Sequence, residues 1–182
     1  MLRITPTALP EVLILEYEKQ FESRGCSYVD FSRRELNDSG IEDDFIEENV
    51  YCPEKAGTLY GIHFQNNPMA QVKLLYCTKG RGLDFAVDLR RDSNTYKQWI
   101  CVELSLENRK QIYIPKGFGH AFLSLEDNTH VVMRIDNYFH QKYRRGIAWN
   151  DPELNIAYPI RNPILAQHDI KAPFLKDSDC NL

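Results

Sequence analysis

Residues 57–73 read GTLYGIHFQNNPMAQVK, two short β-like runs separated by an Asn-Asn-Pro turn. In an alternating strand, residues two apart face the same way, so Gly61, His63 and Gln65 share one face. A histidine on a polar strand face is a candidate acid or base, although a lone histidine is more often structural. Gln65 beside it is a candidate substrate contact, and Lys73 lies near the start of the second run.

The same strand pattern continues along the chain. Turn signals separate short apolar runs at intervals of roughly 8 to 12 residues, which is the spacing of an all-β sandwich or barrel. There is no βαβ alternation and no repeat of fixed period. We expect strands at 58–64, 72–77, 83–88, 99–104, 111–114, 121–125 and 131–138.

The N-terminal part differs from this pattern. Residues 12–17 are expected to form an edge strand, followed by a turn that carries Arg24. Ser32 as N-cap and Glu35 three residues later are typical of a capping box, so we predict a short helix that stops near Gly40.

The remaining segments fit a single domain of residues 1–182 with a barrel core at about 58–160. The acidic residues of 42–48 indicate a solvated loop rather than a metal site, because nothing rigid spaces the carboxylates. The tail, 161–182, contains two prolines and is expected to wrap the barrel.

Composition excludes several classes of function. The net charge of −4 and the lack of a basic run give no general attraction to nucleic acid. No apolar segment approaches the roughly 20 residues of a membrane span, and no leader pattern is visible, so a cytoplasmic protein is expected. The five cysteines are scattered and never form a CxxC pair, which favours reduced thiols.

The sequence gives little indication of a metal site or of a catalytic nucleophile. The five histidines (His63, His120, His130, His140 and His168) contain no HxH pair, so a metal site would have to be assembled from distant segments, and none is expected. There is no GxSxG elbow and no phosphate-binding GxxxxGK loop.

Six runs follow one another in order: GTLYGIHFQ, AQVKLL, FAVDLR, WICVELS, IYIPKGFGHAFL and GIAWNDPELNIAYP. With the FESRG turn and the PILAQHDIKAPFL tail, they resemble the dTDP-4-dehydrorhamnose 3,5-epimerase family of nucleotide-sugar epimerases over nearly the whole chain. The resemblance implies a cupin-type jelly-roll barrel with a short N-terminal helix and a C-terminal tail packed on the barrel. It also implies no metal or other cofactor, and a homodimer in which one subunit's N-terminal region contributes to the other's site.

Such enzymes remove a proton beside a ketone, which requires a base, a cation for the enolate oxygen and an acid on the opposite face. The resemblance places the base on His63 and its orienting carboxylate on Asp169. Lys73 matches the lysine near the developing enolate. Arg24 and His120 match positions that contact the nucleotide-sugar.

The sequence departs from the family pattern at several positions of the site. Tyr60 replaces an arginine, so one phosphate contact is lost, and Cys26 and Ser27 replace residues that are more often aromatic. Met133 stands where the family has its tyrosine acid, and a thioether has no proton to give. Water or another hydroxyl such as Tyr138 would then reprotonate, or one centre alone is inverted, or catalysis is lost. Tyr60 and Met133 are nevertheless expected substrate contacts.

The predicted function is inversion of C3, C5 or both in a nucleotide-linked 4-keto-6-deoxy sugar, for bacterial surface polysaccharides such as capsule or lipopolysaccharide. The sugar could be a dTDP-linked hexose on the way to rhamnose, or a GDP-linked heptose. A 3,4-ketoisomerase and a non-catalytic cupin that binds a nucleotide-sugar are the alternatives.

Overall fold

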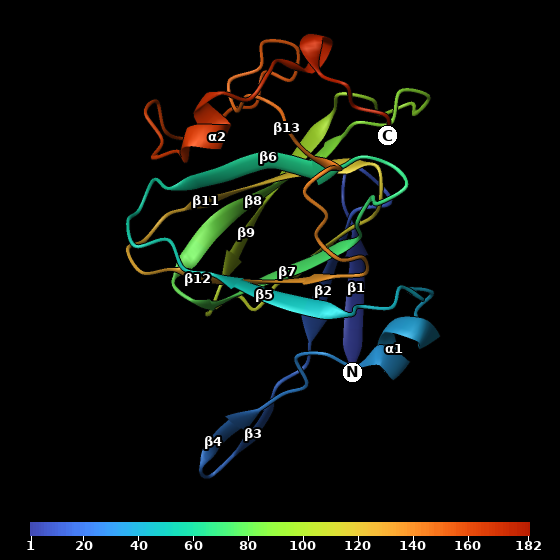
Figure 1. The fold of residues 1–182 in the computed structure, drawn as a ribbon. Helices are drawn as coiled ribbons and strands as arrows, with labels where there is room; N and C mark the ends of the chain where they lie inside the picture. The colour runs from blue at the N-terminus through green and yellow to red at the C-terminus, as the bar shows by residue number, and fades with distance from the viewer.

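The computed structural model describes all 182 residues, which form two antiparallel β-sheets stacked face to face (Figure 1). The six-stranded sheet comprises, in spatial order, β1 (Leu2–Pro6), β2 (Leu13–Tyr17), β10 (Gln111–Ile114), β7 (Lys73–Lys79), β12 (His130–Ile135) and β5 (Glu47–Tyr51). The five-stranded sheet comprises β13 (Arg144–Gly146), β6 (Leu59–Gln65), β11 (Phe118–Ser124), β8 (Arg81–Asp88) and β9 (Trp99–Ser105). This arrangement confirms the predicted all-β jelly-roll barrel.

Apolar side chains fill most of the space between the two sheets. Leu75, Ile112 and Met133 of the six-stranded sheet belong to one buried cluster with Ala86 and Phe122 of the five-stranded sheet. Removing these side chains from water supplies the main driving force for stacking the sheets. The part of this space that is not filled forms a cavity, described below.

The C-terminal tail covers the outer face of the five-stranded sheet (Figure 1). It contains α2 (Gln167–Ile170) and a 3-10 helix (Leu175–Asp177). Leu175 and Cys180 of the tail pack with Ile62 and Phe85 of the sheet in a second buried cluster. The predicted packing of the tail on the barrel is therefore confirmed, and it brings α2 next to β6.

The predicted short helix is α1 (Arg33–Asp38). The Ser32 hydroxyl accepts a hydrogen bond from the backbone N–H of Glu35 at 3.2 Å, which confirms the N-cap. The N–H of Ser32 itself donates to the hydroxyl of Tyr17 at 3.1 Å. None of the helices has the length and apolar content that a membrane crossing requires.

Two predictions about strands were wrong. Residues 12–17 were expected at a sheet edge, but β2 lies between β1 and β10, because β1 pairs along its whole length. The predicted strand 131–138 ends at Ile135, where the chain turns away.

Several further elements were not predicted. β1 is five residues long, and its short sequence did not predict a strand. β5 carries the acidic sequence EENVY at the open edge of its sheet, where it pairs with β12 alone. The turn that carries Arg24 joins a small hairpin, β3 (Gln20–Glu22) and β4 (Gly25–Ser27), which projects away from the barrel (Figure 1).

A β-bulge in β6 changes which residues face the cavity. His63 pairs with His120 and Tyr60 pairs with Phe122, so three steps along β6 match two steps along β11. Because of the extra residue, Tyr60 and His63 both line the cavity, although strict alternation would have placed them on opposite faces. Gly61 lies in this bulge with φ +108°, a conformation that other residues rarely adopt.

We expect Gly61→Ala to lower the free energy of unfolding, because backbone strain alone costs about 1–3 kcal/mol. A Cβ at this position would also clash with the carbonyl oxygen of His120. Thermal and urea unfolding followed by circular dichroism would measure the change. Gly146→Ala, on the neighbouring strand, is the control, since its nearest contact is 3.5 Å away. Equal stability of the two variants would contradict the assigned role of Gly61.

Candidate active site

A cavity of about 450 Å³ lies between the two sheets. One wall comes from β5, β7 and β12 of the six-stranded sheet: Glu47, Asn49, Tyr51, Lys73, Leu75, Val131, Met133 and Ile135. The opposite wall comes from β6, β11 and β13: Tyr60, His63, Phe64, Gln65, His120, Phe122 and Arg144. Gln71, Phe139 and His168 complete the lining. The cavity is therefore lined by apolar residues together with several groups that can exchange protons or carry charge.

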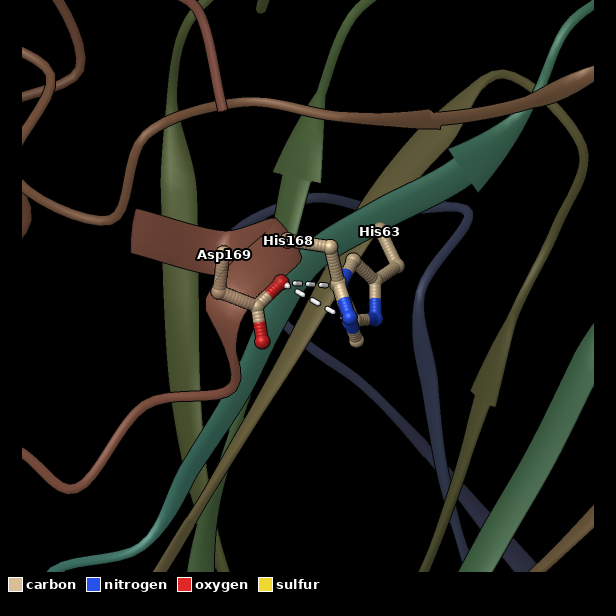
Figure 2. A group of neighbouring side chains, drawn as sticks. All are labelled: His63, His168 and Asp169. Atoms are coloured by element: carbon tan, nitrogen blue, oxygen red, sulfur yellow. Dashed lines mark hydrogen bonds and ion pairs between the residues drawn. The ribbon is translucent and has the colours of Figure 1, made fainter. Parts of the chain in front are cut away.

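His63 on β6 forms a close pair with Asp169 on α2. Nε2 of His63 lies 2.5 Å from Oδ1 of Asp169, and the two side chains approach each other directly (Figure 2). The Asp169 side chain is 4% exposed. The carboxylate fixes the tautomer with the proton on Nε2, and Nδ1, which makes no hydrogen bond, is left free to accept a proton.

Burial and charge act in opposite directions on His63. Burial lowers the pKa of His63 below its usual value of 6.5, because it disfavours the charged ring. The hydrogen bond to Asp169 and its negative charge partly restore the pKa, whereas the positive charges of Lys73 and Arg144 lower it. A lowered pKa keeps the ring neutral, and so able to act as a base, at neutral pH.

A second imidazole lies beside this pair. Nε2 of His168 is 3.4 Å from Oδ1 of Asp169, and its ring centroid is 5.4 Å from that of His63 (Figure 2). The ligand atoms of the three residues lie within 4.8 Å of one another, the size of a metal site. Two ligands of a tetrahedral zinc ion lie about 3.3 Å apart, so an ion could enter only if the 2.5 Å bond between His63 and Asp169 opened.

Lys73 places a positive charge inside the cavity. Its side chain is almost fully buried, and Nζ donates a hydrogen bond to the carbonyl oxygen of His63 at 3.3 Å. Burial lowers the pKa of Lys73 to about 8, although the negative charge of Asp84 opposes the change. At neutral pH most molecules therefore keep the ammonium form, and above pH 8 the cavity progressively loses this charge.

His120 is held by a buried carboxylate. Nε2 of His120 lies 2.9 Å from Oδ2 of Asp84, which is fully buried on β8. Burial raises the pKa of Asp84, while His120 and Lys73 act to lower it. The hydrogen bond at Nε2 holds the imidazole in place, and His120 lines the cavity.

The structure brings most of the predicted site residues together, with two exceptions. Tyr60, Gln65 and Met133 line the cavity with His63, Lys73 and His120, and Asp169 lies directly behind His63. Arg24 lies on the projecting hairpin, where its exposed guanidinium pairs with Glu22 at 2.7 Å. Tyr138 is 58% exposed and lies outside the cavity lining, so it lacks the position expected of an acid.

The side-chain amide of Gln65, a predicted substrate contact, forms hydrogen bonds with backbone groups of its own chain. Its amide nitrogen donates to the carbonyl oxygens of Met69 at 2.7 Å and Tyr138 at 3.1 Å. Its amide oxygen accepts from the N–H of His140 at 2.6 Å. These bonds use its polar atoms to hold the loop around residues 138–140 against β6.

Several lining residues were missed from the sequence. Glu47, Asn49 and Tyr51 lie on β5, a strand hidden by its acidic composition. Arg144 was missed because β13 is three residues long, yet Arg144 lines the cavity and forms no ion pair with a carboxylate. His168 could have been found from its position beside Asp169 in the LAQHD segment.

Comparison with known proteins gives one consistent family. The family model for dTDP-4-dehydrorhamnose 3,5-epimerase matches residues 6–177. A dTDP-4-dehydrorhamnose 3,5-epimerase from Shigella flexneri is 35% identical over 179 residues, which cover 98% of each chain.

Solved structures agree with the sequence matches. The crystal structure of a dTDP-4-dehydrorhamnose 3,5-epimerase from Bacillus anthracis with TDP and PPi bound superposes with a TM-score of 0.93, at 36% identity over 96% of this chain and 99% of that one. The epimerase from Legionella pneumophila in complex with dTDP-4-keto-L-rhamnose superposes with a TM-score of 0.92. Its sequence identity is 33%, and the match covers 98% of this chain and 95% of that one.

We expect Asp169→Asn to lower the pKa of His63 further, because the carboxylate favours the charged ring. Titration of ¹⁵N-labelled histidine by NMR would measure the midpoint for His63 in the variant and in the unmodified protein. Asp179→Asn removes an exposed carboxylate from the same tail, where it pairs with Arg145, and should leave the midpoint unchanged. An unchanged His63 midpoint in Asp169→Asn would contradict the pairing.

Proposed function

The chain belongs to the dTDP-4-dehydrorhamnose 3,5-epimerase family, whose members are isomerases, and from this membership we propose that it inverts C3, C5 or both in a nucleotide-linked 4-keto-6-deoxy sugar. The observation that carries this proposal is the His63–Asp169 pair beside the ammonium of Lys73 in one cavity. We further propose that residues 1–182 act as one epimerase domain in the cytoplasm, supplying sugars for surface polysaccharides.

The proposed reaction begins with the loss of a proton next to the ketone. The hydrogens on C3 and C5 are acidified because the electrons left behind delocalise onto the C4 carbonyl oxygen as an enolate. Nδ1 of His63 is the proposed base, since Nε2 is held by Asp169. The imidazolium formed in this step lies against the Asp169 carboxylate, which stabilises its charge.

Lys73 is proposed to stabilise the enolate oxygen. Its ammonium lies in a largely apolar cavity, where an ionic interaction is stronger than in water. The value of about 8 for its pKa leaves it charged at neutral pH but able to share its proton. His120, held at Nε2 by Asp84, is proposed to accept a hydrogen bond from a sugar hydroxyl at Nδ1 or, in its charged form, to donate to a phosphate oxygen.

The nucleotide is proposed to lie toward Arg144, His168 and Phe139. Arg144 has no carboxylate partner, so its guanidinium can meet a phosphate where the family arginine at Tyr60 is missing. The relatives with TDP or dTDP-4-keto-L-rhamnose support a dTDP-linked substrate. The replacement at Tyr60 is a specific reason to test GDP-linked sugars, including a heptose, beside the dTDP-linked ones.

Inversion at C3 alone is a second candidate, and Met133 favours it. A methionine at the position of the family acid removes a proton donor from the wall opposite His63. If the remaining donor can reach one carbon only, a single centre is inverted.

Proton NMR in deuterated water tests the proposed function. We expect deuterium at C3, or at C3 and C5, of a dTDP- or GDP-linked 4-keto-6-deoxy sugar. His63→Ala should reduce the exchange rate at least about 100-fold, as for loss of a general base. His130→Ala removes a histidine outside the cavity lining and serves as the control. A carbonyl that moves to C3 would indicate a ketoisomerase, and no exchange with any of these sugars would overturn the enzymatic proposal.

We also propose that the protein acts as a homodimer with shared sites. The hairpin of β3 and β4 pairs only with itself, and an isolated two-stranded hairpin is marginally stable in water. Phe21 on this hairpin is 79% exposed. A second copy of the chain would bury this ring and receive Arg24 in its cavity, which would explain why Arg24 lies far from the cavity of its own chain.

Mixing two inactive variants tests this arrangement. If Arg24 acts in the partner's cavity, mixing Arg24→Ala chains with His63→Ala chains should produce mixed dimers with one intact site each. That site combines His63 of the first chain with Arg24 of the second. Activity should then return to about a quarter of the wild-type value, because about half of the dimers are mixed. Each variant mixed with itself is the control. No recovery, with mixed dimers demonstrated by mass spectrometry, would contradict a shared site.

A further inference from the structure

The proposed inversion leaves one step without a residue. After His63 removes a proton from one face of the sugar, an acid must return a proton to the other face, or the original configuration is restored. The wall opposite His63 is formed by the six-stranded sheet. Met133 lies in the middle of this wall, between Asn49 and Leu75, and it has no proton to give.

Strand register shows which side chains surround Met133. On β5, Asn49 lies directly opposite Met133, and Tyr51 lies opposite Val131. Tyr51 is thus a diagonal neighbour of Met133 on the same face of the sheet, and both residues line the cavity. Diagonal neighbours on paired strands lie about 7–8 Å apart, a distance that an aromatic side chain can span.

The other titratable groups near this wall are engaged elsewhere. Oε1 of Glu47 accepts a hydrogen bond from the side-chain amide of Asn49 at 2.8 Å. Nζ of Lys73 is directed to the carbonyl oxygen of His63 on the opposite wall. Tyr60 lies on β6, the strand that carries the base itself.

We propose that Tyr51 is the general acid that protonates the enolate on the face opposite His63. This inference rests on the proposed epimerase function. The Tyr51 O–H bond breaks as a C–H bond forms at the sugar carbon, and the enolate electrons return to restore the C4 carbonyl. The phenolate then regains a proton from water, and His63 releases the proton that it took.

The surroundings of Tyr51 suit this role. Its ring contacts the edge of Tyr60, with centroids 5.7 Å apart at 62°, which fixes its orientation. Burial and the negative charge of Glu47 raise the pKa of Tyr51, so the phenol stays protonated until the enolate forms. The residue is 36% exposed, so water can reach the phenolate afterwards.

Tyr51→Phe separates proton removal from inversion. In deuterated water, we expect this variant to retain solvent exchange at the carbon that His63 deprotonates. Formation of the inverted product should fall about 100-fold or more, as for loss of a general acid. Exchange without inversion is the signature, because His63 then returns deuterium to the face from which it removed the proton.

Two further variants complete the experiment. Tyr76→Phe removes a hydroxyl from β7 of the same sheet, outside the cavity lining, and it should retain inversion. The double variant Tyr51→Phe/Met133→Tyr places a hydroxyl back on the same wall, one strand away, and should recover inversion. This recovery would also show that the single variant had not simply misfolded.

The outcomes distinguish this inference from the proposed function. No exchange by the unmodified protein would overturn the function, and the inference with it. Normal inversion by Tyr51→Phe would overturn the inference and leave the function standing. Loss of both exchange and inversion in Tyr51→Phe would also overturn it, because an acid acts only after His63 has removed the proton.

Discussion

A carboxylate can orient a buried imidazole only while the two are in contact, and His63 and Asp169 lie 106 positions apart in the chain. The whole C-terminal tail must therefore be held on the barrel. Asp151 is almost fully buried and accepts hydrogen bonds from the backbone N–H groups of Glu153 and Leu154, close to it in the chain. It also accepts one from the N–H of Leu175, which connects the tail to the segment that precedes it. Asp151, which has no proposed role in the chemistry, thus helps to hold the tail that carries Asp169.

The cavity places a cation where a cation is costly. Burying an ammonium in an apolar environment disfavours its charged form, which is why the pKa of Lys73 falls to about 8. The fully buried Asp84 partly compensates, and Asp84 is itself held by His120. The compensation is incomplete, because the pKa of Lys73 stays below its usual value. The low polarity that destabilises the ammonium also strengthens its attraction to an enolate, which a better solvated lysine would stabilise less.

Local signals predicted the barrel strands well because β6 to β12 carry apolar runs bounded by turns. They also predicted α1, since Ser32 and Glu35 form a cap within four residues. β5 could not be predicted from its own sequence, because its stability comes from pairing with β12 rather than from its acidic residues. Because β5 was not predicted, its residues Glu47, Asn49 and Tyr51 were not included in the predicted site.

The prediction of Asp169 depended on family resemblance, since nothing local to LAQHD indicates a contact with β6. The bulge at Gly61 was equally hidden. It exists because β6 and β11 differ by one residue in the paired segment, so that Tyr60 turns toward the cavity against the period of the strand. Long-range contacts and register shifts of this kind are properties of the assembled sheets.

The two walls of the cavity differ in a way that bears on stereochemistry. His63 and His120 line the cavity from the five-stranded sheet, while Leu75, Val131 and Met133 form an apolar centre on the opposite wall. With a tyrosine at Met133, a proton donor would stand in the middle of that wall. With Tyr51 as the donor, the hydroxyl comes from β5, at the edge of the sheet and next to Tyr60. Such an off-centre donor would approach the two carbons beside the ketone unequally, and the proposed reaction would then favour inversion at the carbon nearer to β5.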